Sequence, residues 1–178
     1  MTTTDAQLDP VTRFVQRAEA VGCETTRTGP DEATDAIAAT CSGRTVGSNW
    51  WFDDRAISDA VALPEEVVVE PSMAELERAE TGVTGVPFAI AAYGAVAVPS
   101  TPALDGPISL YPNRHVAVVR SVDVVPDVAD GLARLSDAFA RGVNDVVLVT
   151  GPSSTGDMGA LVRGVHGPAE MHVVVIEE

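Results

Sequence analysis

Residues 146–168 read VVLVTGPSSTGDMGALVRGVHGP, and this stretch decides the fold class. An apolar, β-branched run at 146–149 gives way to a Gly/Ser/Thr-rich loop, which leads into a segment whose apolar residues have helical spacing. This order predicts a strand buried on both faces, a loop and a helix, with backbone N–H groups and hydroxyls converging where the helix begins. Such a position binds anions. Walker A chemistry is excluded, because that loop ends in Gly-Lys-Ser/Thr and this chain contains no lysine.

Outward from this stretch, helical and strand patterns alternate. Asp9 and Pro10 are a typical N-cap and first helical residue, and Ser72 to Glu75 has the S-x-x-E spacing of a capping box. Four helices are therefore expected, at 9–22, 31–40, 72–78 and 126–142. Strands are expected where short apolar or β-branched runs are bounded by Gly and Pro, at 45–46, 67–70, 88–91, 95–98, 108–111, 116–119, 146–149 and 171–176.

This alternation predicts an α/β fold, a three-layer α/β/α sandwich with a mixed, mostly parallel sheet. A chain of 178 residues with 46% hydrophobic content builds one substantial core, and a second independent domain would be cramped. We expect a single domain over residues 1–178.

Charge restricts the partners. The formal net charge is −15, and all 11 basic side chains are arginine. This balance repels nucleic acid and anionic membrane surfaces, so neither is expected as a partner. Dense carboxylates without lysine are typical of proteins from salt-loving archaea, whose acidic surfaces stay hydrated in molar salt. The alternative is an unusually acidic mesophilic protein.

Targeting signals and metal ligands are sparse. No run approaches the roughly 18 apolar residues of a membrane span, and residues 1–9 lack the pattern of a signal peptide, so we expect a cytoplasmic protein without membrane insertion. Cys23 and Cys41 do not form a CxxC pair and are interpreted as small buried thiols. His115 and His172 begin apolar strands and are interpreted as structural. We expect no metal and no cofactor.

Three segments together resemble a known family. They are Gly82-Val83-Thr84-Gly85 with the Phe88–Ala91 run, the GPSSTGD loop at 151–157, and the GVHGP turn at 164–168. In this combination the chain is similar to the LUD domain, the family of lactate-utilisation protein C. The resemblance covers roughly residues 82–176. It implies a fold similar to that of sugar-phosphate isomerases and CoA-transferases, and a role beside iron–sulfur proteins in the oxidation of L-lactate to pyruvate.

The chain also departs from that family. Where the family has Glu-Thr-Gly-Thr/Ser after the Phe-x-Ile-Ala strand, this chain has Ala92-Tyr93-Gly94-Ala95. Ser154 stands where many relatives carry arginine, and Gly159 where glutamate is common. Chemistry that depends on those groups is therefore in doubt.

The candidate ligand-binding residues can hydrogen-bond an anion or leave room for one. They are Thr84, Gly85, Gly151, Ser153, Ser154, Thr155, Asp157, His166 and Gly167. Ser153 and Thr155 could donate hydroxyl hydrogen bonds while Asp157 fixes the loop, although Ser, Thr and Asp are also the usual N-caps of a helix. By resemblance, the Gly-rich turn with Thr84 and Gly85 faces the same cleft.

Asp157 and His166 are the candidate catalytic residues. A histidine between glycines could protonate or orient a substrate near neutral pH, or it could simply hold the neighbouring loop.

Two classes of function remain open. The first is a LUD-domain subunit that binds a small carboxylate or phosphate metabolite and docks onto iron–sulfur oxidoreductase partners. The alternative is a stand-alone isomerase or CoA-transferase-type enzyme, or a metabolite-sensing regulatory module. The missing glutamate at Ala92 weighs against the enzyme, because CoA transfer commonly uses a carboxylate nucleophile.

Overall fold

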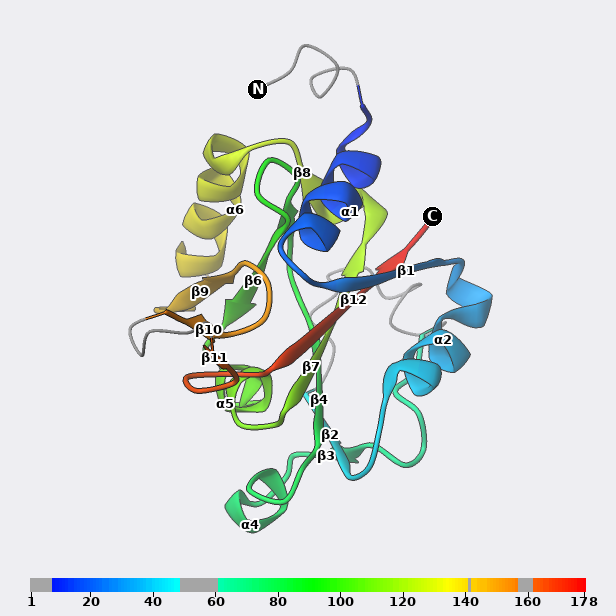
Figure 1. Ribbon diagram of the computed structural model, residues 1–178. Helices are drawn as coiled ribbons and strands as arrows, with labels where there is room; N and C mark the ends of the chain where they lie inside the picture. Colours follow the sequence, from blue (N-terminus) through cyan, green and yellow to red (C-terminus); the bar gives the residue numbers. More distant parts are fainter. Residues whose placement is uncertain (1–7, 49–60, 141, 157–161) are drawn as a thin grey trace.

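The computed structural model describes residues 8–48, 61–140, 142–156 and 162–178 (Figure 1). The helices are α1 (Pro10–Ala20), α2 (Ala33–Thr40), α4 (Met73–Leu76), α5 (Asp105–Leu110) and α6 (Val128–Ala140). Two 3-10 turns, η2 (Pro30–Glu32) and η3 (Ser121–Asp123), lie between these elements. No helix within the described ranges is long and apolar enough to cross a membrane.

The two helix caps predicted from the sequence are present in the structure. The Asp9 carboxylate accepts a hydrogen bond from the Thr12 N–H at 3.0 Å, and Pro10 is the first residue of α1. Ser72 and Glu75 cap α4 reciprocally, with 2.8 Å between the Ser72 N and a Glu75 carboxylate oxygen. This helix ends at Leu76, two residues before the expected end.

The central sheet has six strands, and every neighbouring pair is parallel. Its order is β1 (Glu24–Thr28), β12 (Glu170–Ile176), β7 (Arg114–Arg120), β4 (Thr81–Gly85), β2 (Thr45–Gly47) and β3 (Val68–Val69). A second, four-stranded sheet has the order β8 (Val124–Val125), β5 (Ala89–Ile90), β6 (Ala95–Pro99) and β9 (Val146–Val149). Its β5–β8 pair is parallel, and its other two pairs are antiparallel.

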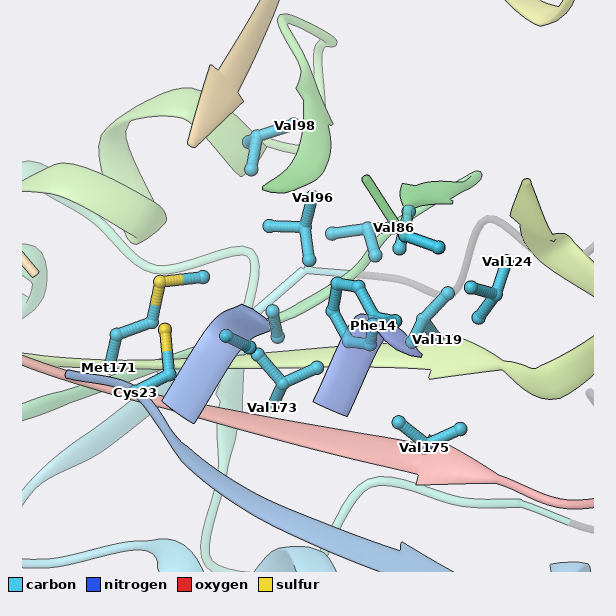
Figure 2. Packing of buried hydrophobic residues seen from close by; sticks show 14 residues of the cluster. Phe14, Cys23, Val86, Val96, Val98, Val119, Val124, Met171, Val173 and Val175 are labelled. Carbon is cyan, nitrogen blue, oxygen red and sulfur yellow. The ribbon is translucent and has the colours of Figure 1, made fainter. Parts of the chain in front are cut away.

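Helices cover both faces of the central sheet, which confirms the predicted three-layer α/β/α fold. On one face, Ile37 of α2 packs against Val116 of β7 and Val174 of β12. On the other face, Phe14 of α1 lies among valines of β7, β12 and the second sheet (Figure 2). Helix α6 covers the outer face of the second sheet.

One expected strand is a helix. Residues 108–111 were predicted as a strand, but Ile108 lies inside α5. A short apolar run does not distinguish a strand from a buried helical turn. Pro107 in the first turn is compatible with a helix, because N–H groups there have no intrahelical partner.

Strand β9 is less buried than its sequence indicates. The continuous VVLV run predicted burial on both faces, whereas Val147 and Leu148 are 45% and 41% exposed. Strand β1, with the polar sequence ETTRT, was not predicted, because it lies at the edge of its sheet and has no apolar alternation.

Candidate functional site

Ser153 joins the GPSS segment to the GVHGP turn. Its N–H donates to the Pro168 carbonyl at 2.9 Å, and its own carbonyl accepts from the Gly164 N–H at 3.0 Å. The Ser153 hydroxyl oxygen accepts from the His166 N–H at 3.3 Å. The two segments that carry most of the candidate residues therefore lie together. We call residues 151–156 and 162–168 the loop–turn unit.

Within the described residues, the loop contains a strand where the spacing predicted the approach to a helix. Strand β10 (Ser154–Thr155) pairs antiparallel with β11 (Val162–Arg163), so the described part of this stretch is a β-hairpin. The helical spacing was misleading because Val162 and Val165 do not form a buried face; they are 40% and 51% exposed. Ser153 and Thr155 therefore cap no helix within the described residues. Asp157 lies outside the described residues.

The loop–turn unit lies at the amino end of the central sheet. The GVHGP turn precedes β12, so it lies at the amino end of that strand and not at a carboxyl end, where open α/β sheets usually bind ligands. The GPSS segment follows β9 of the second sheet. Gly151 has φ +76°, and a Cβ there would lie 2.8 Å from the Val21 carbonyl oxygen. Glycine is thus required where the loop passes over the end of α1.

Thr84 and Gly85 do not form a turn. Both are buried within β4, and the Thr84 hydroxyl lies 2.9 Å from Nε2 of His115 on β7. Gly82 of the same segment is needed for packing and not for a turn. A Cβ at this position would lie 2.0 Å from the Ile108 carbonyl oxygen of α5. The glycine permits close packing of a helix on the sheet.

His115 is fully buried, and its burial lowers its pKa to about 4. The ring is therefore neutral at pH 7. Within the described ranges, its Nδ1 has no hydrogen-bond partner. The sequence did not single out this residue as part of a polar pair in the core, because nothing local to His115 indicates that Thr84 lies on the next strand.

His172 belongs to a charged network across three strands. Its Nε2 lies 2.8 Å from the Thr26 hydroxyl, and its Nδ1 lies 3.1 Å from a Glu24 carboxylate oxygen. Arg114 also contacts Glu24 at 3.1 Å and forms an ion pair with Glu170. The hydrogen bond to His172 lowers the pKa of Glu24, and partial burial lowers the pKa of His172. These contacts tie the amino ends of β1, β12 and β7 together, as expected for a structural histidine.

The residues that replace the family's Glu-Thr-Gly-Thr/Ser lie next to the loop–turn unit. Val96 of β6 pairs with Val149 of β9, which places residues 92–95 beside the start of the GPSS segment. A Cβ on Gly94 would lie 2.4 Å from the Ala18 nitrogen, so this turn packs directly on α1. The departure in sequence thus falls at the candidate site itself.

The sequence analysis did not identify Arg163 as a cationic side chain of the loop–turn unit. Arg163 pairs with Ser154 in the hairpin, and directly paired residues of antiparallel strands present their side chains on the same face. Its Nη2 lies 3.4 Å from where a Cβ on Gly22 would be. Arg163 is exposed and takes part in no ion pair within the described residues. Only the hairpin pairing could have drawn attention to it.

The two cysteines lie next to different elements. Cys23 precedes β1 and is 7% exposed, and burial raises the pKa of its thiol to about 11. Cys41 follows α2 and is half-buried, with its thiol pKa also raised by burial. The described residues contain no group of three or more His, Cys, Asp or Glu side chains that could hold a metal ion.

Residues 11–176 match the family model described as the LUD domain. The chain belongs to the LUD domain family. A lactate utilization protein C from Deinococcus radiodurans is 33% identical to this LUD domain over 108 residues, which are 59% of this chain and 50% of the relative. Another, from Bacillus licheniformis, is 33% identical over 108 residues, covering 57% and 44%. The chain spans about half the length of the curated relatives that it matches.

The fold of this LUD domain also matches a solved structure. A DUF162 family protein from Deinococcus radiodurans aligns with a TM-score of 0.70 at 24% identity. The alignment covers 98% of this chain and 99% of the other. At this level of identity, the match supports the fold.

Proposed function

We propose that this LUD domain acts in lactate utilisation and binds a small carboxylate or phosphate metabolite at the loop–turn unit. The observation that carries the binding site is the geometry of Ser153, whose backbone and side-chain oxygen hold the GVHGP turn against the GPSS segment. Family membership and the relatives named lactate utilization protein C support lactate as the metabolite.

The chemistry of the unit favours an anion. Ser153 accepts a hydrogen bond from the turn, and in the described part of the chain its own hydroxyl hydrogen has no protein acceptor, so it is available to a ligand. A carboxylate or phosphate accepts such a donor strongly, because hydrogen bonds to charged groups are about twice as strong as neutral ones. The exposed side chain of His166 and the half-buried hydroxyl of Thr155 lie in the same unit.

Arg163 supplies the charge that the hydroxyls lack. In a chain with a net charge of −15, a metabolite anion is repelled at most of the surface, so a local cation is needed. Arg163 lies on β11 directly opposite Ser154 of β10. By resemblance to the family, arginine is expected at the Ser154 position itself. We infer that the guanidinium reaches the same position from the neighbouring strand.

Electron transfer would take place in partner proteins. Cluster ligation commonly uses four cysteine thiolates, and this chain has two cysteines. We therefore propose that the LUD domain presents or senses the metabolite beside cytoplasmic iron–sulfur oxidoreductases that oxidise L-lactate to pyruvate.

Isothermal titration calorimetry with L-lactate and with inorganic phosphate tests the binding site. Replacing Ser153 and Thr155 together by alanine should weaken binding at least tenfold, because each lost hydrogen bond to a charged ligand is worth roughly 1.5–3 kcal/mol. Arg163→Gln should have a similar effect and, since the side chain is exposed, should not alter the fold. Ser136→Ala and Arg78→Gln, at exposed residues elsewhere in the chain, are the matched controls.

Unchanged affinity in both folded variants would exclude the loop–turn unit as the binding site. The cellular role has a separate test. A strain of the source organism without this gene should fail to grow on L-lactate but grow on pyruvate, and normal growth on L-lactate would contradict the proposed role.

A further inference from the structure

A cavity lies between strand β8 and the first turns of α6, and the proposed function does not use it. Its volume is about 450 Å³, within the range of roughly 300–1,000 Å³ that is typical of small-ligand sites. Val124 and Val125 of β8, Pro126, and Ala133 of α6 supply its apolar lining. The cavity shares no residue with the loop–turn unit. Figure 1 shows β8 and the start of α6 at the top of the molecule, with β10 and β11 below them.

Asp130 and Arg134 add one negative and one positive charge to the lining. The two residues are four positions apart in α6, so their side chains lie on the same face of the helix, one turn apart. Such neighbours often form an ion pair, but the Asp130 carboxylate pairs with no cation among the described residues. The cavity therefore presents two separate charges of opposite sign beside an apolar surface.

The Asp123 carboxylate fixes the orientation of Arg134. One Asp123 oxygen accepts from Arg134 Nη1 at 3.0 Å, and the other accepts from Arg120 Nε at 2.6 Å. The Asp123 side chain is 7% exposed, whereas that of Arg134 is 45% exposed. A guanidinium has five N–H donors, so most of those on Arg134 stay available to a ligand while the group is held in place. A donor that is already held loses less entropy on binding.

We propose that this cavity binds a free amino acid with an apolar side chain. The α-carboxylate would accept hydrogen bonds from Arg134, and the α-ammonium group would donate to Asp130. The side chain of the ligand would lie on Val124, Val125 and Pro126, which removes apolar area from water. Both charged groups of the ligand would then have a partner of opposite sign.

The charge of the whole chain also favours a zwitterion. A net charge of −15 repels anions, and a zwitterion carries no net charge for it to repel. A simple carboxylate that pairs with Arg134 would give Asp130 no partner. A simple amine that pairs with Asp130 would use none of the donors of Arg134. Only a ligand with both groups uses the whole lining.

An extended peptide fits this position less well, although β8 lies at the edge of its sheet among the described strands. A peptide that adds a strand needs free N–H and C=O groups along that edge. The Val124 N–H already donates to the Ser121 carbonyl, and Pro126 has no N–H. Strand β8 therefore offers few backbone groups for pairing, and the cavity suits a small molecule.

Isothermal titration calorimetry of the full chain with L-leucine tests the proposal. We expect leucine to bind, and we expect at least tenfold weaker binding of isocaproate, which lacks the ammonium group, and of isoamylamine, which lacks the carboxylate. Each of these analogues loses a hydrogen bond between charged groups. Asp130→Asn should weaken leucine binding at least tenfold and remove the preference for leucine over isocaproate. Arg134→Gln should weaken the binding of leucine and isocaproate alike.

Two controls should bind leucine like the wild type. Asp35→Asn changes an exposed aspartate of α2 in the same way as the test variant. The double alanine variant of Ser153 and Thr155 separates this cavity from the loop–turn unit.

A wild type that does not bind leucine at millimolar concentration would overturn the proposal. Equal affinities for leucine and isocaproate, or wild-type affinity in the Asp130→Asn variant, would overturn it as well. Arg134→Gln also removes a contact of the buried Asp123, so the Asp130→Asn variant decides the matter. Asp130 is exposed, so circular dichroism should show that this variant is folded.

Discussion

Replacing His115 by glutamine should remove much of the acid sensitivity of this LUD domain. Burial lowers the pKa of His115 from 6.5 to about 4 in the folded chain, while the unfolded chain keeps the ordinary value. Because the folded pKa is the lower one, the stability from the neutral ring is complete above pH 6.5. It is lost progressively as the pH falls from there to about 4.

The size of this effect follows from the pKa difference. Each unit corresponds to about 1.4 kcal/mol, so protonation of His115 should remove roughly 3 kcal/mol of unfolding free energy. That is a large share of the total, since domains are typically stable by about 5–15 kcal/mol. Glutamine does not titrate, and its amide can still hydrogen-bond the Thr84 hydroxyl.

Urea denaturation from about pH 7.5 to 4, at one KCl concentration, measures the difference. The carboxylates titrate alike in both proteins, so the difference between the two curves reports His115. Val116→Ala is the matched control, because Val116 is the next residue of β7, is fully buried and does not titrate. Its curve should run parallel to that of the wild type. If the H115Q curve is also parallel to it, His115 is not a buried neutral ring and the reasoning is wrong.

Three further predictions address salt, backbone and thiols. The melting temperature should rise from dilute to molar KCl, because salt screens the repulsion within a chain of net charge −15; a flat or falling value would remove the argument for salt adaptation. Gly94→Ala should lower the unfolding free energy by at least about 2 kcal/mol, because Gly94 has φ +63° and its Cβ would overlap the Ala18 backbone. Gly142→Ala, at φ +97° with no atom within 4 Å, should cost only about 1 kcal/mol by chemical denaturation, and equal losses would contradict the packing argument. A thiol reagent should modify Cys41 before Cys23 in the folded chain, and the reverse order by mass spectrometry would show that Cys23 is accessible.

The fold class followed from local signals that have little ambiguity. The caps at Asp9 and Ser72 act through hydrogen bonds within four residues, so the sequence shows them directly. The long valine-rich runs of β7 and β12 are buried on both faces, as expected of central parallel strands. The strand predicted at 108–111 was wrong because an apolar run of four residues is too short to show a period of two or of 3.6 residues.

The candidate site was less accessible to sequence reasoning, because its contacts are long-range. The GPSS segment and the GVHGP turn, both among the candidate binding residues, lie side by side, and Ser153 makes that contact. The segment with Thr84 and Gly85 was misread as a turn because a glycine that permits close packing, as Gly82 does here, looks the same in sequence as a glycine in a turn. Arg163 could not be found without the hairpin, since only its pairing with Ser154 brings it to the loop.

The central claim is that a metabolite anion binds at the loop–turn unit, and an NMR titration of the ¹⁵N-labelled chain with L-lactate tests it most directly. We expect the largest amide shifts in residues 151–156 and 162–168, with the Arg163 side-chain signals moving in parallel. Shifts that cluster instead at the carboxyl ends of the central strands, around Ser48, Val86 and Ser121, with the loop–turn unit unchanged, would contradict the account.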